Sequence, residues 1–231
     1  MKFFEKRQLT ILLAAFVLAS CSAAQLSDND IPDKWEMWEG RGNVVINESS
    51  MTYYAVNLQD EEYDYDIEGR GPALIAAKRI RGKKWILDVK SLFFSNDKVF
   101  NRFSMGIWAG NPEKRPNLAS KNAELIVSVT RTRGGESGDN SLRLEIRNGE
   151  NRETVEFPVN TQFFRFQREK NDLTIYYSGG FKPKYEYAYT VRIPSKAELR
   201  FFAGARYDGV ISGKPRMVIN SLTLNDKNFL E

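Results

Sequence analysis

The residues best suited to chemistry in this chain form one acidic stretch, Asp60–Glu68, with the sequence DEEYDYDIE. If the stretch is extended, its side chains alternate between two faces, so Glu62, Asp64, Asp66 and Glu68 share one face. Carboxylates at this spacing could act as a general acid and base, or their oxygens could bind Ca²⁺. A solvated acidic edge or turn is the third interpretation, and the pattern alone leaves all three open.

A second group combines aromatic and hydrogen-bonding side chains. On the expected strand Phe103–Ala109, alternation places Met105 and Ile107 on one face and Trp108 on the other. Trp108 is therefore expected in a groove, unless it fills the core between two sheets. Sugar sites need an aromatic plate for the apolar face of the ring and planar polar groups for its hydroxyls. The polar and aromatic side chains that could join Trp108 in a carbohydrate-binding site are Asn111, Arg115, Arg165, Gln167, Tyr176, Arg206, Tyr207 and Asp208.

The residue types that are scarce exclude several classes of enzyme. The chain has no histidine and a single cysteine, Cys21. Ser-His-Asp catalysis, Cys-His catalysis and histidine-based zinc sites are therefore excluded, and any chemistry must use carboxylates, Tyr, Lys, Arg or an oxygen-bound metal ion. The net charge of +4 falls to +2 without the first 20 residues, which gives no indication of nucleic-acid binding. The one basic run, Lys78–Lys84, lies at an expected turn, where such charges are usually solvated.

The first 21 residues have the pattern of an export signal. A basic start precedes an apolar run, Leu9–Leu18, of about ten residues, which is too short to span a bilayer. The sequence Leu18-Ala19-Ser20-Cys21 resembles the lipobox of bacterial lipoproteins. That resemblance implies cleavage before Cys21, fatty acylation such as palmitate on Cys21, and delivery to the outer membrane, because Ser22 follows the cysteine. An ordinary secretory signal is the alternative, and periplasmic or surface orientation stays open.

The elements that must position these groups are strands. After a signal peptide over 1–20 and a lipidated cysteine with a polar tether over 21–34, residues 35–231 form one expected domain. This domain has short apolar and alternating runs separated by Gly, Asn, Asp and Pro, which predicts an all-β, two-sheet antiparallel jelly-roll sandwich. The expected strands cover 43–47, 52–58, 73–79, 85–94, 103–109, 123–130, 141–147, 153–157, 164–169, 173–178, 187–193, 198–206 and 217–224.

Several of these runs resemble concanavalin A-like, laminin-G-like jelly rolls. In Phe163–Ser178, an Arg-bearing strand turns through Lys170-Asn171-Asp172 into a strand that ends Tyr-Tyr-Ser. Further matches are Trp85–Val89, Met105–Trp108 and Phe201–Arg206. The resemblance implies two packed, curved sheets with a groove on the concave side, where relatives bind or cut glycans.

The stretch Asp64-Tyr65-Asp66-Ile67-Glu68 is similar to the Glu-x-Asp-x-Glu catalytic strand of family 16 glycoside hydrolases. The similarity implies that Asp64 attacks, Asp66 tunes and Glu68 protonates the leaving oxygen. The match is incomplete, because Asp64 is one methylene shorter than glutamate and the motif lies among the first strands. A retaining reaction needs carboxyl groups about 5–5.5 Å apart, whereas α-carbons four residues apart on a strand are separated by roughly 13 Å.

Together these observations predict a lipoprotein of the bacterial cell envelope whose jelly-roll domain binds a glycan without hydrolysing it. Its expected partners are the membrane, through the lipid on Cys21, and the glycan, with no nucleic acid. Ca²⁺ is the one cofactor that the acidic stretch could bind. The alternatives are a retaining glycoside hydrolase that uses Asp64 and Glu68, and a structural or interaction lipoprotein with a protein partner.

Overall fold

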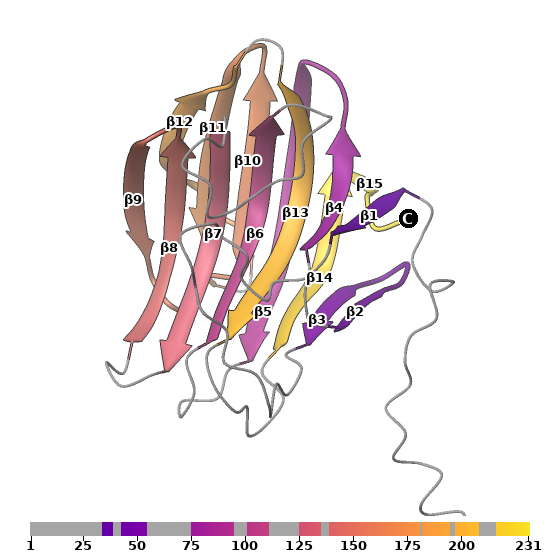
Figure 1. Cartoon of the computed structure of the whole chain (residues 1–231), viewed down its shortest axis with the longest axis vertical. Coiled ribbons are helices and arrows are strands. Elements are labelled where there is room, and N and C mark those ends of the chain that lie inside the picture. Colours follow the sequence, from indigo (N-terminus) through magenta and orange to yellow (C-terminus); the bar gives the residue numbers. More distant parts are fainter. Residues whose placement is uncertain are drawn as a thin grey trace, which may run out of the picture. The chain divides into compact units, whose positions relative to one another are not determined.

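The computed structural model describes residues 34–38, 43–54, 75–94, 101–110, 125–134, 139–180, 182–194, 197–207 and 216–231. All of these ranges lie within one compact unit, Ile31–Glu231. Their regular elements are all strands, which form two antiparallel sheets (Figure 1). No helix in these ranges has the length and apolar character that a bilayer crossing requires. The prediction of an all-β, two-sheet jelly-roll sandwich is therefore confirmed.

The first sheet has seven strands in the order β1-β4-β13-β6-β7-β8-β9, and it faces the viewer in Figure 1. Its strands are β1 (Trp35–Trp38), β4 (Ile75–Ile80), β6 (Asn101–Gly110), β7 (Leu125–Gly134), β8 (Asp139–Asn148), β9 (Asn151–Phe157) and β13 (Glu198–Tyr207).

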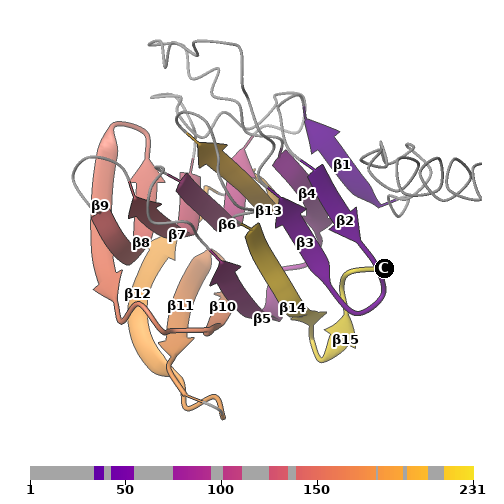
Figure 2. The same cartoon turned by 90° about the horizontal axis from the view of Figure 1, so that it is seen from below.

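The second sheet has eight strands, in the order β12-β11-β10-β5-β14-β3-β2 with β15 paired to β14. Its strands are β2 (Asn43–Ile46), β3 (Met51–Tyr54), β5 (Lys84–Phe94), β10 (Phe163–Glu169), β11 (Asp172–Ser178), β12 (Glu186–Arg192), β14 (Arg216–Leu224) and β15 (Lys227–Asn228). Figure 2 shows the two sheets stacked as layers.

The strands form where apolar and polar residues alternate, because a pleated strand sends successive side chains to opposite faces. Burial follows this period of two along β5 and along β10. Hairpin turns occur at the predicted breaks: β8 and β9 are joined by a two-residue turn that begins at Gly149, whose φ of 60° suits glycine.

The core lies between the two sheets. It includes Phe164 and Phe166 from β10 together with Phe103, Met105 and Ile107 from β6, all with no exposed surface. Burying an aliphatic or aromatic side chain of this size contributes about 1.5–3 kcal/mol, so packing across this layer stabilises the sandwich.

Contacts at both edges join the two sheets. At one edge, Phe157 on β9 stacks on Tyr177 of β11, with ring centroids 4.6 Å apart, and the Tyr189 hydroxyl on β12 donates to Glu153 on β9. At the other edge, the Trp35 indole N–H on β1 donates to the Leu230 carbonyl at 2.8 Å. The outer face of each sheet is therefore the surface that points away from this closed core.

Two short strands, β1 and β15, were not predicted, whereas each of the thirteen expected strands overlaps a strand of the structure. The missed strands have four and two residues, too few for an alternation to be recognised. Cys21, the tether up to residue 33 and the acidic stretch Asp60–Glu68 lie outside the described residues.

Candidate functional site

The outer face of the seven-stranded sheet presents polar side chains in register across neighbouring strands. On β8, Leu142, Leu144 and Ile146 point into the core, so the residues between them point outward. Strand pairing then sets Ser104, Thr130, Arg143 and Glu156 in one row across β6 to β9. In the row on one side of it, Ser128 on β7 lies opposite Glu145 on β8. In the row on the other side, Arg102 on β6 lies opposite Thr132 on β7.

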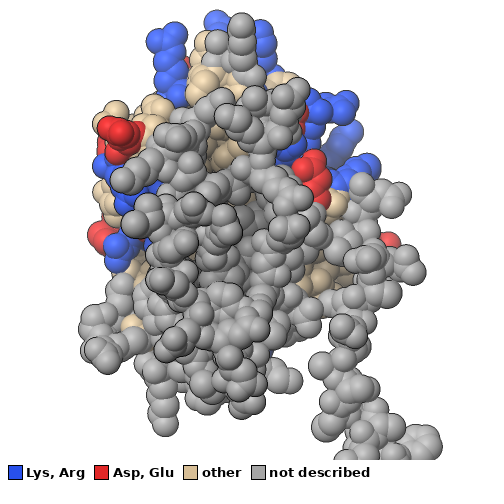
Figure 3. Space-filling view, viewed as in Figure 1, with Lys and Arg blue, Asp and Glu red and all other residues tan. Residues whose placement is uncertain are grey.

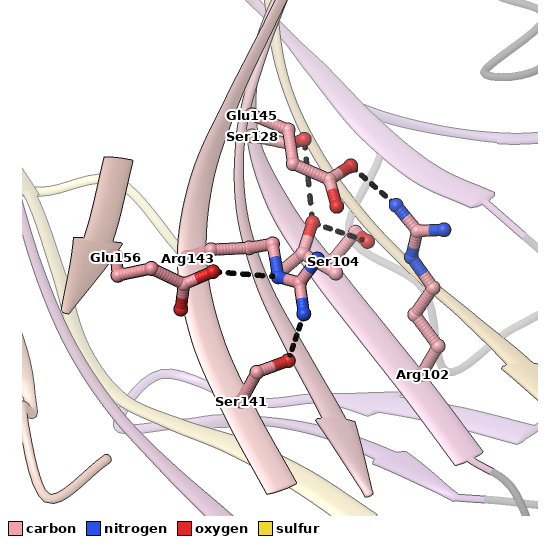
Figure 4. Close-up of polar contacts among 8 residues, drawn as sticks. Arg102, Ser104, Ser128, Ser141, Arg143, Glu145 and Glu156 are labelled. Carbon is pink, nitrogen blue, oxygen red and sulfur yellow. Dashed lines mark hydrogen bonds and ion pairs between the residues drawn. The ribbon is translucent and has the colours of Figure 1, made fainter. Parts of the chain in front are cut away.

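These side chains form three neighbouring bonded groups, shown in Figure 4, which together we call the polar cluster. Arg102 Nη2 donates to Glu145 Oε2. The hydroxyl oxygens of Ser104 and Thr130 are 3.1 Å apart, and those of Ser128 and Thr130 are 3.4 Å apart. The members of the polar cluster are Arg102, Ser104, Ser128, Thr130, Ser141, Arg143, Glu145 and Glu156.

Arg143 links the cluster to the sheet edge. Its Nη2 donates to Ser141 Oγ at 2.6 Å, and its Nε lies 3.6 Å from Glu156 Oε1 on β9. Both contacts fix the plane of the guanidinium group.

The charged ends of the cluster are partly open to solvent, whereas Ser128 and Thr130 are buried. Arg102, Glu145 and Arg143 have side-chain exposures of 30%, 26% and 30%, respectively. Thr130 has no exposed surface, so it supports its neighbours and does not itself contact a ligand. A ligand on this face would meet guanidinium donors and carboxylate acceptors held by a layer of hydroxyl groups.

Two further arginines extend the positive charge of this face. Arg147 on β8 lies directly opposite Arg152 on β9. Burial lowers the pKa of Arg147, the charge of Arg152 lowers it further, Glu145 opposes the shift, and Arg102 adds to it. In Figure 3, Lys and Arg atoms stand beside Asp and Glu atoms over β8 and β9 at the left of this face.

Trp108 lies on the outer face of the same sheet, which confirms that it points away from Phe103, Met105 and Ile107. However, its side chain is not open: the residue is only 3% exposed. The Arg200 guanidinium carbon lies 5.3 Å from the ring centroid, and Arg200 Nη2 is 2.8 Å from Glu198 Oε1. The expectation of an exposed aromatic plate at Trp108 is therefore not met in this structure.

Arg165, Gln167 and Tyr176 are placed elsewhere. They lie on β10 and β11, on the outer face of the eight-stranded sheet, because the neighbouring Phe164 and Phe166 face the core. The structure therefore does not bring them to Trp108, which lies on the opposite outer face of the sandwich. The sequence predicted both strands but not the sheet that they join. That sheet depends on the pairing of β10 with β5, and β5 comes from a distant part of the chain.

Arg165 has a local structural role in that second sheet. Its Nε and Nη2 donate to the two carboxylate oxygens of Asp88, at 2.6 and 2.8 Å. The Tyr185 hydroxyl donates to the same carboxylate at 3.1 Å, and the Arg165 guanidinium lies 4.2 Å from the Tyr185 ring centroid. Burial, with the charge of Asp88, raises the pKa of Tyr185 to about 12, so this phenol stays protonated and keeps donating.

The other predicted site residues are not described. Arg206 and Tyr207 lie on β13, but their side chains are outside the description. Among the described residues, no three acidic or cysteine side chains lie close enough to hold a metal ion together. The candidates that fall outside the described residues are Cys21, Glu62, Asp64, Asp66, Glu68, Asn111, Arg115 and Asp208.

The sequence interpretation missed the polar cluster. Its signal was the alternation Ser141-Leu142-Arg143-Leu144-Glu145-Ile146-Arg147, which places the four polar residues of this run on one face of β8. Strand β7 gives a similar pattern with Ser128, Thr130 and Thr132. The alternation does not show which side chains pair with each other, because Arg102 and Glu145 are 43 positions apart in the chain.

Comparison with known proteins supports the fold and gives no family assignment. No protein-family model matches the chain, and no curated protein matches it. One similar solved structure is the VIP36 exoplasmic/lumenal domain in its Ca²⁺/Man3GlcNAc-bound form, at 12% identity and a TM-score of 0.53, covering 84% of this chain and 86% of that one. Another is a functionally unknown protein from Saccharomyces cerevisiae, at 11% identity and a TM-score of 0.50, covering 83% and 95%. At these identities the similarity shows the jelly-roll fold alone.

Proposed function

We propose that this protein binds carbohydrate through the polar cluster on the outer face of the seven-stranded sheet. The observation that carries the proposal is the arrangement of Arg102, Arg143 and Glu145: partly exposed donors and an acceptor, fixed side by side on a rigid sheet. Sugar hydroxyls are recognised by planar groups of this kind, whose orientation is set before the ligand arrives. The similarity of the fold to a domain recorded with Man3GlcNAc bound supports the same ligand class.

The proposal is tested by calorimetric titration of the whole chain, in mild detergent, with oligosaccharides of plant, algal, host and peptidoglycan origin. We expect one class to bind, and we expect the double substitution Arg102→Ala and Arg143→Ala to lower that affinity at least tenfold. Arg192→Ala is the matched control, because Arg192 is an exposed arginine on β12, in the other sheet. Absence of binding across all four sources would overturn the proposal.

We also propose that Cys21 carries a lipid and anchors the domain to the outer membrane of a bacterial envelope. The support is the export-signal pattern followed by the lipobox-like sequence at the only cysteine. Cys21→Ser should move the protein from the membrane fraction to the soluble fraction, and intact-mass spectrometry should show an acylated amino-terminal cysteine in the parent protein. An unmodified Cys21 in the membrane fraction would contradict this proposal.

A further inference from the structure

Two turns at one end of the sandwich are held together. The turn Arg81-Gly82-Lys83 joins β4 to β5, and the turn Lys170-Asn171 joins β10 to β11. The Lys170 N–H donates to the Lys83 carbonyl at 2.7 Å. The buried Arg168 side chain bridges the turns, because its Nε donates to the Lys170 carbonyl and its Nη1 to the Gly82 carbonyl, each at 2.9 Å. The two turns therefore form one rigid end.

The side chains that project from this end are basic. Arg81, Lys83, Lys84 and Lys170 are all exposed, and we call these four residues the basic end. In Figure 3, Lys and Arg atoms project along the top of the molecule, where β4 and β10 finish in Figure 1. Neither turn contains an acidic residue. A surface that approaches along the strands therefore meets cations first.

Acidic side chains at the neighbouring strand ends lie beside cations. By strand register or by sequence the pairs are Glu169 with Lys84, Asp172 with Arg192, and Asp226 with Lys227. The Lys84 Nζ is 3.9 Å from Glu169 Oε1, and the two side chains are 84% and 61% exposed. Solvent screens such an ion pair, so Lys84 can exchange this partner for another anion.

The chain enters the domain at the same end. Trp35, the first residue of β1, lies opposite Lys78 on β4, and the turn that begins at Arg81 is about 10 Å further along that strand. Cys21 precedes Trp35 by 14 residues, and a chain of this length spans at most about 50 Å. A lipid on Cys21 would therefore hold the membrane within reach of the basic end.

The chemistry of the basic end suits phosphate groups at a surface. Ammonium and guanidinium groups both bind phosphate oxygens. The negative potential of a membrane with anionic phospholipids attracts them, and it decays within about 10 Å at 0.1 M salt. Only side chains at the surface itself are attracted strongly. Because all four side chains are exposed on protruding turns, they can meet a plane of headgroups together.

We infer that the basic end docks on anionic phospholipid headgroups of the membrane that holds the lipid of Cys21. The inference rests on the proposed anchoring at Cys21 and goes beyond it, because it fixes how the domain is oriented.

This orientation keeps the polar cluster accessible. Strand pairing sets Leu199 beside both Ile80 and Ala109, so Ala109 lies at the basic end of β6. Arg102 lies seven residues earlier on β6, towards the opposite end of the sheet. With the basic end on the membrane, the polar cluster therefore points its Arg102 side away from the lipid.

The test compares the whole lipidated chain on vesicles of phosphatidylcholine alone and on vesicles that also contain phosphatidylglycerol. A short pulse of an amine-acetylating reagent, followed by peptide mass spectrometry, measures how fast each lysine reacts. We expect Lys83, Lys84 and Lys170 to react at least about threefold more slowly on the anionic vesicles, and high salt should remove the difference. Lys182 and Lys184 follow Ser178, at the opposite end of β11, and should react equally on both.

Two double variants locate the effect. Arg81→Gln with Lys170→Gln should abolish the protection of Lys84 on anionic vesicles. Lys182→Gln with Lys184→Gln is the matched control, because it removes two exposed cations from the opposite end, and it should leave the protection unchanged. Arg168 contacts only the backbone carbonyls of the turns, so neither variant breaks the bridge. Thermal midpoints verify that both variants are folded.

The outcomes separate the inference from the anchoring proposal. Equal reaction of the basic-end lysines on both kinds of vesicle, with the protein still attached, would overturn the inference and leave the anchor intact. Equal protection of Lys182 and Lys184 would also overturn it, because the domain would then be attracted without a fixed orientation. A chain with an unmodified Cys21 that stays off both kinds of vesicle would overturn both.

Discussion

Trp108 on β6 lies directly opposite Arg200 on β13, with the guanidinium carbon 5.3 Å from the centre of the indole ring. Arg200 Nη2 is 2.8 Å from Glu198 Oε1, and its Nε is 3.4 Å from Glu36 Oε2. Trp108 is therefore part of a packed group of charged and aromatic side chains, at the end of the sheet away from Arg102.

This packing predicts that Trp108 stabilises the fold. We expect Trp108→Ala to lower the free energy of unfolding by about 3 kcal/mol, because truncating a buried tryptophan leaves a cavity. Trp108→Phe should cost less, since it keeps part of the ring. Urea denaturation measures both variants, and an unchanged midpoint for Trp108→Ala would show that the ring is not packed as the structure has it.

Gly106, two residues earlier on β6, should not accept a side chain. A Cβ at this position would meet the Val127 carbonyl oxygen and would lie 2.8 Å from Ser128 Cα, both of them backbone atoms of β7. We expect Gly106→Ala to destabilise the protein by at least about 1 kcal/mol, because the sheet must shift to make room. Gly179→Ala is the control, since no atom lies within 4 Å of its Cβ position. Equal stability of the two variants in urea would contradict the close approach of β6 and β7.

Lys78 should make stability depend on pH. It is only 4% exposed, and its Nζ donates to the Phe229 carbonyl at 2.6 Å. Burial, with a smaller contribution from the charge of Lys34, lowers its pKa from 10.5 to about 8, against an opposing effect of Glu231. Between these two values the unfolded chain binds more protons than the folded protein, so the free energy of unfolding rises with pH.

We therefore expect the parent protein to gain stability relative to Lys78→Met as the pH increases from 8 to about 10.5. Methionine keeps an unbranched apolar side chain and cannot titrate, so the comparison cancels the titration of other groups. Lys170→Met, at an exposed turn, is the control and should show no such difference. A stability difference that stays constant over this range would show that Lys78 keeps an ordinary pKa.

The ion pair between Asp88 and Arg165 should affect stability but not ligand binding. Asp88→Asn removes the charge that accepts from Arg165 and Tyr185. Because the two side chains of the ion pair are 24% and 30% exposed, solvent screens part of the loss, and we expect a cost of about 1 kcal/mol. Glu169→Gln, which removes the exposed contact with Lys84, should cost less than about 0.5 kcal/mol.

Glycan affinity in Asp88→Asn should equal that of the parent protein, because Asp88 and the polar cluster lie on the outer faces of different sheets. Calorimetric titration of the folded variant gives this comparison. A large loss of affinity would show that the glycan binds to the eight-stranded sheet instead.

The sequence predicted the strands well because side-chain alternation is a local property. Each run that alternates between apolar and polar residues, such as Trp85–Phe94, forms a strand with the expected buried face. The same property placed Trp108 on the face away from Met105. The sequence could not predict the burial of Lys78: the run Lys78–Lys84 looks like a solvated turn, but Lys78 meets the carboxyl-terminal residues Phe229 and Glu231.

By itself, then, the amino-acid order determined the strand positions, the direction of each side chain within its strand, and the absence of histidine chemistry. The tertiary structure decided which strands became neighbours. It separated Arg165 from Trp108, paired Arg102 with Glu145, and set Arg147 against Arg152. The physical reason is that the two-residue alternation of side chains depends only on the sequence of each strand. The order of strands in a sheet depends on packing summed over segments far apart in the chain.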